Sequence, residues 1–192
     1  MFTESYKRNR NKISTAIILH LDGDKKYAKR AINYYNNLNL KAIVKNIQEK
    51  NQAQEVISLL EYYKPNILIS TGHDKMYKKG QDLYNIENYK NSKYFMQVVK
   101  NARRWEKSEK KLVIFAGACE SFYEAIMIEG ANFASSPARI MIEYRDPLII
   151  ASKVAMTSYK KNITIEDLKP YLRSNYNGIG GNCAQGQKKD LT

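Results

Sequence analysis

Short apolar runs rich in β-branched residues alternate along this chain with segments whose apolar residues have helical spacing. The runs predict strands at residues 16–21, 41–47, 66–72, 111–117 and 139–144. The spaced segments predict helices at residues 25–38, 51–63, 92–105, 121–129 and 147–158. Strands that alternate with helices form βαβ units, whose right-handed crossovers place helices on both faces of a sheet. The chain is therefore expected to be an α/β three-layer sandwich around a mostly parallel sheet.

The 192 residues suit a single domain of this class. We expect a flexible basic segment at residues 1–12, the domain itself at residues 13–181, and a flexible, glycine-rich tail at residues 182–192. A polar stretch, residues 75–91, interrupts the alternation and is a candidate lid. No apolar run approaches the roughly 20 residues that cross a bilayer, so no membrane partner is expected.

The charge balance is strongly basic, because 32 Lys and Arg face 19 Asp and Glu for a net charge of +13. Such a balance is typical of proteins with an acidic or nucleic-acid partner. However, the lysines are spread over most predicted helices instead of forming one stripe, so nucleic acid is not the expected partner. A basic, non-enzymatic module that binds nucleic acid or an acidic coat surface remains an alternative. A second is a flavodoxin-like ligand-binding domain, although neither GxGxxG nor GxxxxGK[ST] occurs.

One imidazole and one thiol follow two of the buried strands. His73 comes directly after the strand at 66–72, and Cys119 comes after the strand at 111–117. Binding sites in open parallel sheets lie beyond the carboxyl ends of the strands. If these two strands are neighbours, about 4.8 Å apart, both side chains can face one cleft.

This pairing suits nucleophilic catalysis by a cysteine. The thiolate of Cys119 would attack, and the helix expected at 121–129 would favour its charged form. His73 would act as general acid and base near neutral pH. The amide of Cys119, together with one from Gly72 or Asp74, would hold the oxyanion. The alternative is that the cysteine is an inert small hydrophobe and the histidine is structural.

The remaining histidine and cysteine fit other roles. His20 lies inside the first apolar run, which favours a buried, hydrogen-bonded ring over a catalytic one. Cys183 lies in the glycine-rich tail and is interpreted as incidental. No C-x-x-C or H-x-x-x-H spacing occurs, so neither a metal nor another cofactor is expected.

The order of the two candidate residues resembles that in caspase-like peptidases, where a histidine precedes an Ala-Cys pair by about 50 residues. Here the separation is 46 residues. That resemblance implies a caspase-like variant of the Rossmann-like topology. Caspase-like enzymes have His followed by Gly, whereas this chain has Gly72-His73-Asp74, which leaves the second oxyanion donor open.

Five sequence blocks in order resemble the YabG-type sporulation-specific proteases of endospore-forming bacteria: HLDGDKKY (20–27), STGHD (70–74), NYKNSKYF (88–95), IFAGACES (114–121) and GANFASSP (130–137). The resemblance implies a cysteine peptidase, with His73 and Cys119 as the dyad. It also implies protein substrates of the spore coat and cortex, a preference for cleavage after Arg or Lys, and a location in the mother-cell cytoplasm or spore coat.

A pocket for a basic side chain needs a buried carboxylate, because an unpaired buried charge is costly. Four acidic residues near the strand ends are candidates for this S1 pocket: Asp22, Asp24, Asp74 and Glu120. Asp22 is the preferred candidate, and an equal alternative is that Asp22 is an ordinary turn residue whose side chain hydrogen-bonds its own backbone. Ser135 and Ser136 are either substrate-backbone contacts or ordinary loop serines.

Such an enzyme could also cut itself. The N-terminal segment carries four basic residues that would be substrates for cleavage after Arg or Lys: Lys7, Arg8, Arg10 and Lys12. The sequence therefore predicts self-trimming.

Overall fold

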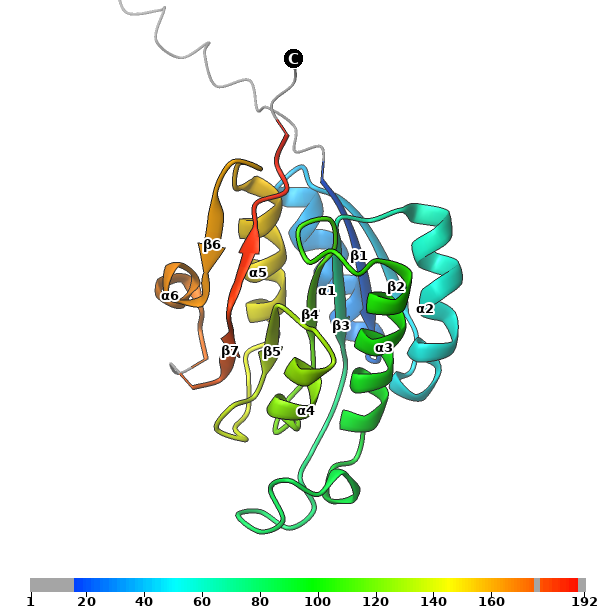
Figure 1. The fold of residues 1–192 in the computed structure, drawn as a ribbon, viewed down its shortest axis with the longest axis vertical. Coiled ribbons are helices and arrows are strands. Elements are labelled where there is room, and N and C mark those ends of the chain that lie inside the picture. The colour runs from blue at the N-terminus through cyan, green and yellow to red at the C-terminus, as the bar shows by residue number, and fades with distance from the viewer. Residues whose placement is uncertain (1–15, 175–176, 190–192) are drawn as a thin grey trace, which may run out of the picture.

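In a computed structural model, residues 16–174 and 177–189 are described, and the expected flexible segment at 1–12 lies outside them. A six-stranded sheet has the order β2-β1-β3-β4-β5-β7, parallel throughout except for the antiparallel pair β5–β7 (Figure 1). Its strands are β1 (Ile17–Asp22), β2 (Lys41–Asn46), β3 (Ile67–Thr71), β4 (Val113–Ala116), β5 (Phe133–Ser135) and β7 (Ile179–Gly181). The expected α/β class is confirmed, and the two strands that precede His73 and Cys119, β3 and β4, are neighbours.

The α-helices that accompany the sheet are α1 (Lys25–Asn37), α2 (Glu49–Tyr63), α3 (Ser92–Trp105), α4 (Tyr123–Ile128), α5 (Arg145–Met156) and α6 (Ile165–Leu168). Their bounds agree with the predicted helices to within about two residues at each end, except that α6 was not expected. Two short 3-10 turns, η1 (Ile86–Asn88) and η2 (Lys169–Tyr171), complete the set.

Alternate strand residues point to opposite faces of the sheet, and each face is covered by its own helices. Ile69 and Phe115 lie in the core cluster that also contains buried residues of α1 and α5. Leu68 and Ile114 lie in the cluster formed with α2, α3 and α4. Both sides of the central strands are fully buried, which explains their continuous apolar runs.

The expected strand at 139–144 is wrong. The fifth strand is β5, a three-residue segment that was too short to show a periodic pattern. Residues 139–144 contain a short apolar run with two β-branched isoleucines, as a strand would, but they form a loop that folds back over the end of β4. There the Ile140 carbonyl accepts the Glu120 amide at 3.1 Å, and the Ile142 amide lies 3.5 Å from the Cys119 sulfur.

Strand β7 lies at the end of the expected domain, and the segment predicted to be a flexible tail contains strand β8 (Cys183–Gln185). Strand β8 pairs antiparallel with β6 (Asn162–Thr164) in a separate two-stranded sheet. In the main sheet, a glycine lets β7 pack closely against the start of β5, because a Cβ on Gly181 would lie 2.4 Å from the Asn132 carbonyl oxygen.

The polar stretch at 75–91 projects beyond the carboxyl ends of the strands (Figure 1). An isolated bridge between Met76 and Tyr89 closes its base. Inside the loop, the Asn88 amide group donates to the carbonyls of Lys78 and Gln81. This loop is tied to the domain by the Met76 amide, which donates to Glu120, so it has defined contacts at its base.

Candidate active site

A cavity of about 200 Å³ lies at the carboxyl ends of β1, β3 and β4. We call it the strand-end cavity. It is lined by Asp22, Tyr27, Thr71, Gly72, His73, Gly117, Ala118, Cys119, Met141, Ile142, Glu143, Tyr144 and Pro147. The imidazole and the thiol that the sequence singled out therefore line the same cavity. The pairing of β3 with β4, which places Ser70 opposite Ala116, ends the two strands at the same level.

The His73 ring is held by a carboxylate. Its Nε2 lies 2.9 Å from Oδ2 of Asp24, while the ring keeps 58% of its side-chain surface exposed. Asp24 is also the N-cap of α1, because its Oδ1 accepts the amides of Lys26 and Tyr27. The hydrogen bond from His73 is the main cause that lowers the pKa of Asp24. Asp24 thus fixes the orientation of the ring from the start of a helix.

The backbone of His73 has a second anchor. Its amide donates to Oε1 of Glu49, the first residue of α2, at 2.7 Å. The Glu49 side chain fits between two glycines, since a Cβ on Gly23 or on Gly72 would lie 2.2 Å from that oxygen. Sequence reasoning missed Glu49, and the two glycines after neighbouring strands are the signal that was available.

A buried polar chain leads from α1 to Asp22. Tyr35 contacts Nδ1 of His20 at 3.0 Å, Nε2 of His20 lies 2.9 Å from Oγ1 of Thr71, and Thr71 donates to Oδ2 of Asp22 at 3.1 Å. Because the Thr71 hydroxyl donates its proton to Asp22, it acts as acceptor for Nε2–H of His20. The other ring nitrogen of His20, Nδ1, then accepts the hydrogen bond from the Tyr35 hydroxyl. Burial raises the pKa of Tyr35 well above its ordinary value, so it keeps that proton. His20 is buried and hydrogen-bonded, as predicted.

Asp22 itself lines the strand-end cavity with only 5% of its surface exposed. Its Oδ1 accepts the Asp24 amide at 2.8 Å. Both carboxylate oxygens are therefore fixed by donors, while apolar and aromatic residues such as Ile142 and Tyr144 form another part of the cavity wall. A cavity of this kind suits a side chain with an aliphatic stem and a cationic end.

Cys119 lies between β4 and α4 and contacts the 139–144 loop. The Ile142 amide donates toward its sulfur at 3.5 Å, and the sulfur also lies 3.9 Å from the Ile142 carbonyl oxygen. Helix α4 begins at Tyr123, two residues later than expected, and has only six residues. The N-terminus of α4 therefore does not directly follow Cys119, whose sulfur contacts the backbone of Ile142 instead.

Of the three residues whose amides were predicted to hold an oxyanion, Gly72 and Cys119 line this cavity and Asp74 does not. Within the described residues, the amides of Gly72 and Cys119 have no hydrogen-bond acceptor. By contrast, the amide of Ala118 donates to Ser121 at 2.9 Å and that of His73 to Glu49. The Gly72 and Cys119 amides are thus open to a ligand.

Asp74 is buried away from this cavity. Its carboxylate accepts from the hydroxyls of Ser92 and Ser121 and from the Asn91 amide. Burial raises the pKa of Asp74, although these hydrogen bonds oppose the change. Because Ser121 also accepts the Ala118 amide, Asp74 supports the turn that carries Cys119.

Glu120 points into a different cavity, next to the 75–91 loop. It forms an ion pair with Lys79 and accepts the Met76 amide at 3.1 Å. Burial opposes its charge, but these two partners outweigh burial and lower the pKa of Glu120. Of the four S1 candidates, only Asp22 lines the strand-end cavity.

The remaining candidates have internal partners. Ser135 donates to the Ala118 carbonyl and Ser136 to the Ile140 carbonyl, which fits ordinary loop serines. Cys183 is exposed and lies in β8. In residues 16–174 and 177–189, no group of three His, Cys, Asp or Glu side chains is arranged to hold a metal ion. Nor does any helix in these ranges have the length and apolar character needed to span a bilayer.

Comparison with known proteins gives the family. Residues 2–192 match the family model described as YabG peptidase U57. The chain belongs to the YabG peptidase U57 family. The resemblance to YabG-type proteases that the five sequence blocks indicated is thereby confirmed.

One member of the YabG peptidase U57 family is the sporulation-specific protease YabG of Bacillus subtilis (strain 168). The chain is 36% identical to it over 164 residues, which cover 85% of the chain and 57% of that protein. The chain therefore spans somewhat more than half the length of this curated relative.

Proposed function

We propose that this chain is a cysteine endopeptidase domain in which Cys119 is the nucleophile and His73 the general acid and base. The observation that carries the proposal is that both side chains line one strand-end cavity, with an imidazole held by Asp24 and a sulfur approached by the Ile142 amide. Membership of the YabG peptidase U57 family supports hydrolysis of peptide bonds.

The reaction begins when the Cys119 thiolate attacks the carbonyl carbon of the scissile bond, and the carbonyl electrons move to oxygen. The amides of Gly72 and Cys119 are available to hold that oxyanion. As the intermediate collapses, His73 gives its proton to the departing amine, and a thioester remains on Cys119. His73 then takes a proton from water, which attacks the thioester and releases the acid and the free thiolate.

Asp22 is the residue we assign to the S1 pocket. Its buried carboxylate can pair with the cationic end of an Arg or Lys side chain, while the apolar wall covers the aliphatic stem. Cleavage after basic residues follows from this assignment. Polypeptides of the spore coat and cortex are the proposed substrates, because the curated relative is named a sporulation-specific protease. The proposed site of action is the mother-cell cytoplasm or the coat.

Alkylation of the two cysteines tests the nucleophile. Cys183 is exposed and Cys119 only partly so, so accessibility alone predicts faster labelling of Cys183 by iodoacetamide. An activated thiolate at the strand-end cavity predicts the opposite order. Mass spectrometry of the labelled peptides, in wild type and in His73→Ala, measures both rates. Faster labelling of Cys183 in the wild type would contradict the proposal.

Self-trimming remains part of the proposal. The basic residues of the N-terminal segment lie outside the described residues, and the prediction rests on their sequence alone. Intact-mass spectra of wild type and Cys119→Ala, purified in parallel, should show shorter N-termini only in the wild type. Identical N-termini in both proteins would count against it.

A further inference from the structure

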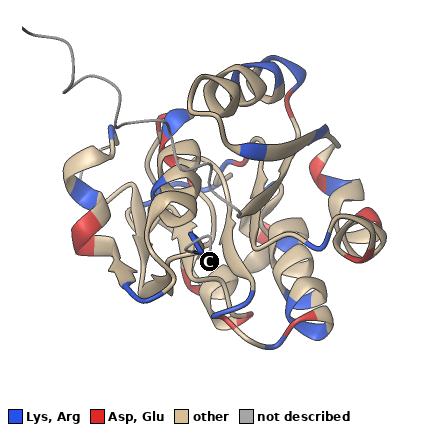
Figure 2. Ribbon diagram, turned by 90° about the horizontal axis from the view of Figure 1, so that it is seen from above, with Lys and Arg blue, Asp and Glu red and all other residues tan. Residues whose placement is uncertain are grey.

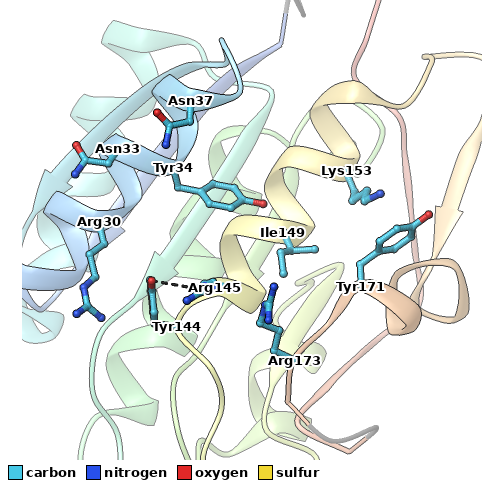
Figure 3. A pocket seen from close by; sticks show the side chains of 10 residues that line it. All are labelled: Arg30, Asn33, Tyr34, Asn37, Tyr144, Arg145, Ile149, Lys153, Tyr171 and Arg173. Atoms are coloured by element: carbon cyan, nitrogen blue, oxygen red, sulfur yellow. Dashed lines mark hydrogen bonds between the residues drawn. The ribbon is translucent and has the colours of Figure 1, made fainter.

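A second cavity, of about 500 Å³, lies between α1 and α5 and is called the basic pocket here. Ten residues line it, and Figure 3 shows them: Arg30, Asn33, Tyr34, Asn37, Tyr144, Arg145, Ile149, Lys153, Tyr171 and Arg173. Four of these side chains are cationic, three are tyrosines, and none is a carboxylate. The pocket is thus a concentrated positive site on a protein whose other lysines and arginines are dispersed over its helices (Figure 2).

Three of the four cations of this pocket, Arg30, Arg145 and Lys153, lie over aromatic rings, and Arg145 Nε also lies 4.0 Å from Oε2 of Glu143. The Arg30 guanidinium lies 4.9 Å from the centre of the Tyr144 ring, and Lys153 Nζ lies 3.2 Å from the centre of the Tyr171 ring. In the described part of the chain, no carboxylate oxygen lies within 4.0 Å of the cationic groups of Arg30, Lys153 or Arg173. Their hydrogen-bond donors are therefore available to an anion.

Buried contacts shape the wall of the basic pocket before any ligand arrives. Asp146 is fully buried in α5, and its two oxygens accept the amides of Arg173 at 2.7 Å and Ser174 at 2.9 Å. Across the pocket, the Tyr34 hydroxyl lies 3.4 Å from Oγ of Ser152 and links α1 to α5. The backbone that carries Arg173 is thus fixed against α5, which lowers the cost of ordering on binding.

The basic pocket adjoins the strand-end cavity, because Tyr144 lines both. The Tyr144 ring stacks on Tyr27, another residue of the strand-end cavity, with ring centres 5.3 Å apart. A polypeptide held in the strand-end cavity therefore has the basic pocket as its neighbour on the far side of this tyrosine pair.

The geometry points to the basic pocket as a binding site for an acidic segment of the polypeptide substrate, beside the bond to be cleaved. This inference rests on the proposed peptidase function. A carboxylate-bearing peptide fits better than nucleic acid, because the cations converge in one concave site instead of following a row of phosphates. Tyrosines and Ile149 offer apolar contact to the same segment.

Binding to the inactive Cys119→Ala protein tests this site without cleavage. The probes are two fluorescein-labelled peptides that each contain one Arg, followed by a run of glutamates in one and of glutamines in the other. We expect the glutamate peptide to bind about tenfold more tightly by fluorescence anisotropy. In the double variant Lys153→Gln/Arg173→Gln, that difference should disappear.

The matched control is Lys50→Gln/Lys107→Gln, which changes the net charge equally at two exposed lysines outside both cavities. It should keep the preference for the glutamate peptide. Equal losses in both double variants would mean that only overall charge matters, and would overturn the inference. So would equal binding of the two peptides, or a pocket variant that loses affinity for a short DNA duplex while keeping its peptide preference.

Cleavage assays separate this inference from the proposed function. Wild type should cleave the glutamate peptide with a lower KM than the glutamine peptide, and Lys153→Gln/Arg173→Gln should raise that KM with kcat unchanged. A wild type that cleaves neither peptide would refute the peptidase proposal, whereas the anisotropy result would still report whether the pocket prefers acidic peptides.

Discussion

The strand-end cavity and the basic pocket share Tyr144 but hold their charged groups in opposite ways. Asp22 in the strand-end cavity is buried, and both of its oxygens already accept hydrogen bonds. In the basic pocket, by contrast, Arg30, Arg145 and Lys153 lie over tyrosine rings. Buried, hydrogen-bonded charges act in fixed positions and are costly to remove, whereas exposed ones contribute little each. Substitutions should therefore have much larger effects in the first site than in the second.

The largest effect is expected where the chemistry is proposed. His73→Ala should lower kcat/KM for an Arg-containing peptide by about a thousandfold, because no other group would protonate the departing amine. Since His73 is exposed, thermal unfolding should stay close to that of the wild type. Kinetic assays and thermal melts check both. An active His73→Ala enzyme would remove the reason for treating the strand-end cavity as catalytic.

The second-largest effect on cleavage is expected from replacing the buried carboxylate of Asp22. Asp22→Asn should reduce cleavage after Arg by about a hundredfold, because a buried guanidinium would lose its counter-charge. The rate of Cys119 alkylation by iodoacetamide should change little, as should cleavage of a peptide with norleucine in place of Arg. Equal losses for the Arg and norleucine peptides would show that Asp22 supports the cavity without selecting a basic side chain.

Asp24→Asn should have a moderate effect. Asparagine can still cap α1, but it loses the charge that orients His73, so kcat should fall about tenfold and the acid limb of the pH profile should move. A kcat and pH profile like those of the wild type would mean that the contact with Asp24 does not position the ring.

Asp24→Asn should also lower the free energy of unfolding at neutral pH. The pKa of Asp24 is lowered in the folded state, so its carboxylate stabilises the fold above its unfolded pKa of about 3.9, and this contribution is lost as the pH falls through the folded value. Because the His73 ring is largely exposed, the contribution should be less than about 1 kcal/mol. Urea unfolding of wild type and Asp24→Asn should give different free energies of unfolding at neutral pH, and the difference should shrink as the pH falls below about 3.9.

The smallest effect is expected at the residue that the two sites share. Tyr144→Phe removes the hydroxyl that contacts Nε of Arg145 at 3.2 Å but keeps the ring stacked on Tyr27. The KM for the glutamate peptide should rise about two- to threefold, and that for the glutamine peptide should not change. A similar rise for both peptides would mean that the hydroxyl acts in the strand-end cavity and not in the basic pocket.

Periodicity predicted the parts of the fold that repeat a pattern. β1 to β4 and the helices packed on them were expected, because their buried faces extend over several residues. β5 and β7 have three residues each, and their position depends on pairing with distant segments. The apolar run in 139–144 was misleading, because those residues use backbone groups to contact the Cys119 turn.

The candidate site was predictable to the extent that it follows from strand order. Strand ends that finish level bring His73 and Cys119 to one cavity, and this needs only the order of two strands. The separate surroundings of Asp22, Asp24, Asp74 and Glu120 could not be distinguished, because each depends on side chains from other elements. The basic pocket could not be predicted from the sequence either, because its cations come from three separate segments: α1, α5 and the residues after η2.

Glu49 gives the histidine a mechanical connection to the rest of the molecule. The carboxylate that accepts the His73 amide belongs to the first turn of α2, a 15-residue helix. Gly23 and Gly72 pack closely around this carboxylate and fix its position. A tilt of α2 would move Glu49 and, through this hydrogen bond, the backbone that carries the His73 imidazole. A partner that binds the outer surface of α2 and shifts this helix would therefore also move the imidazole that we propose as the general acid and base.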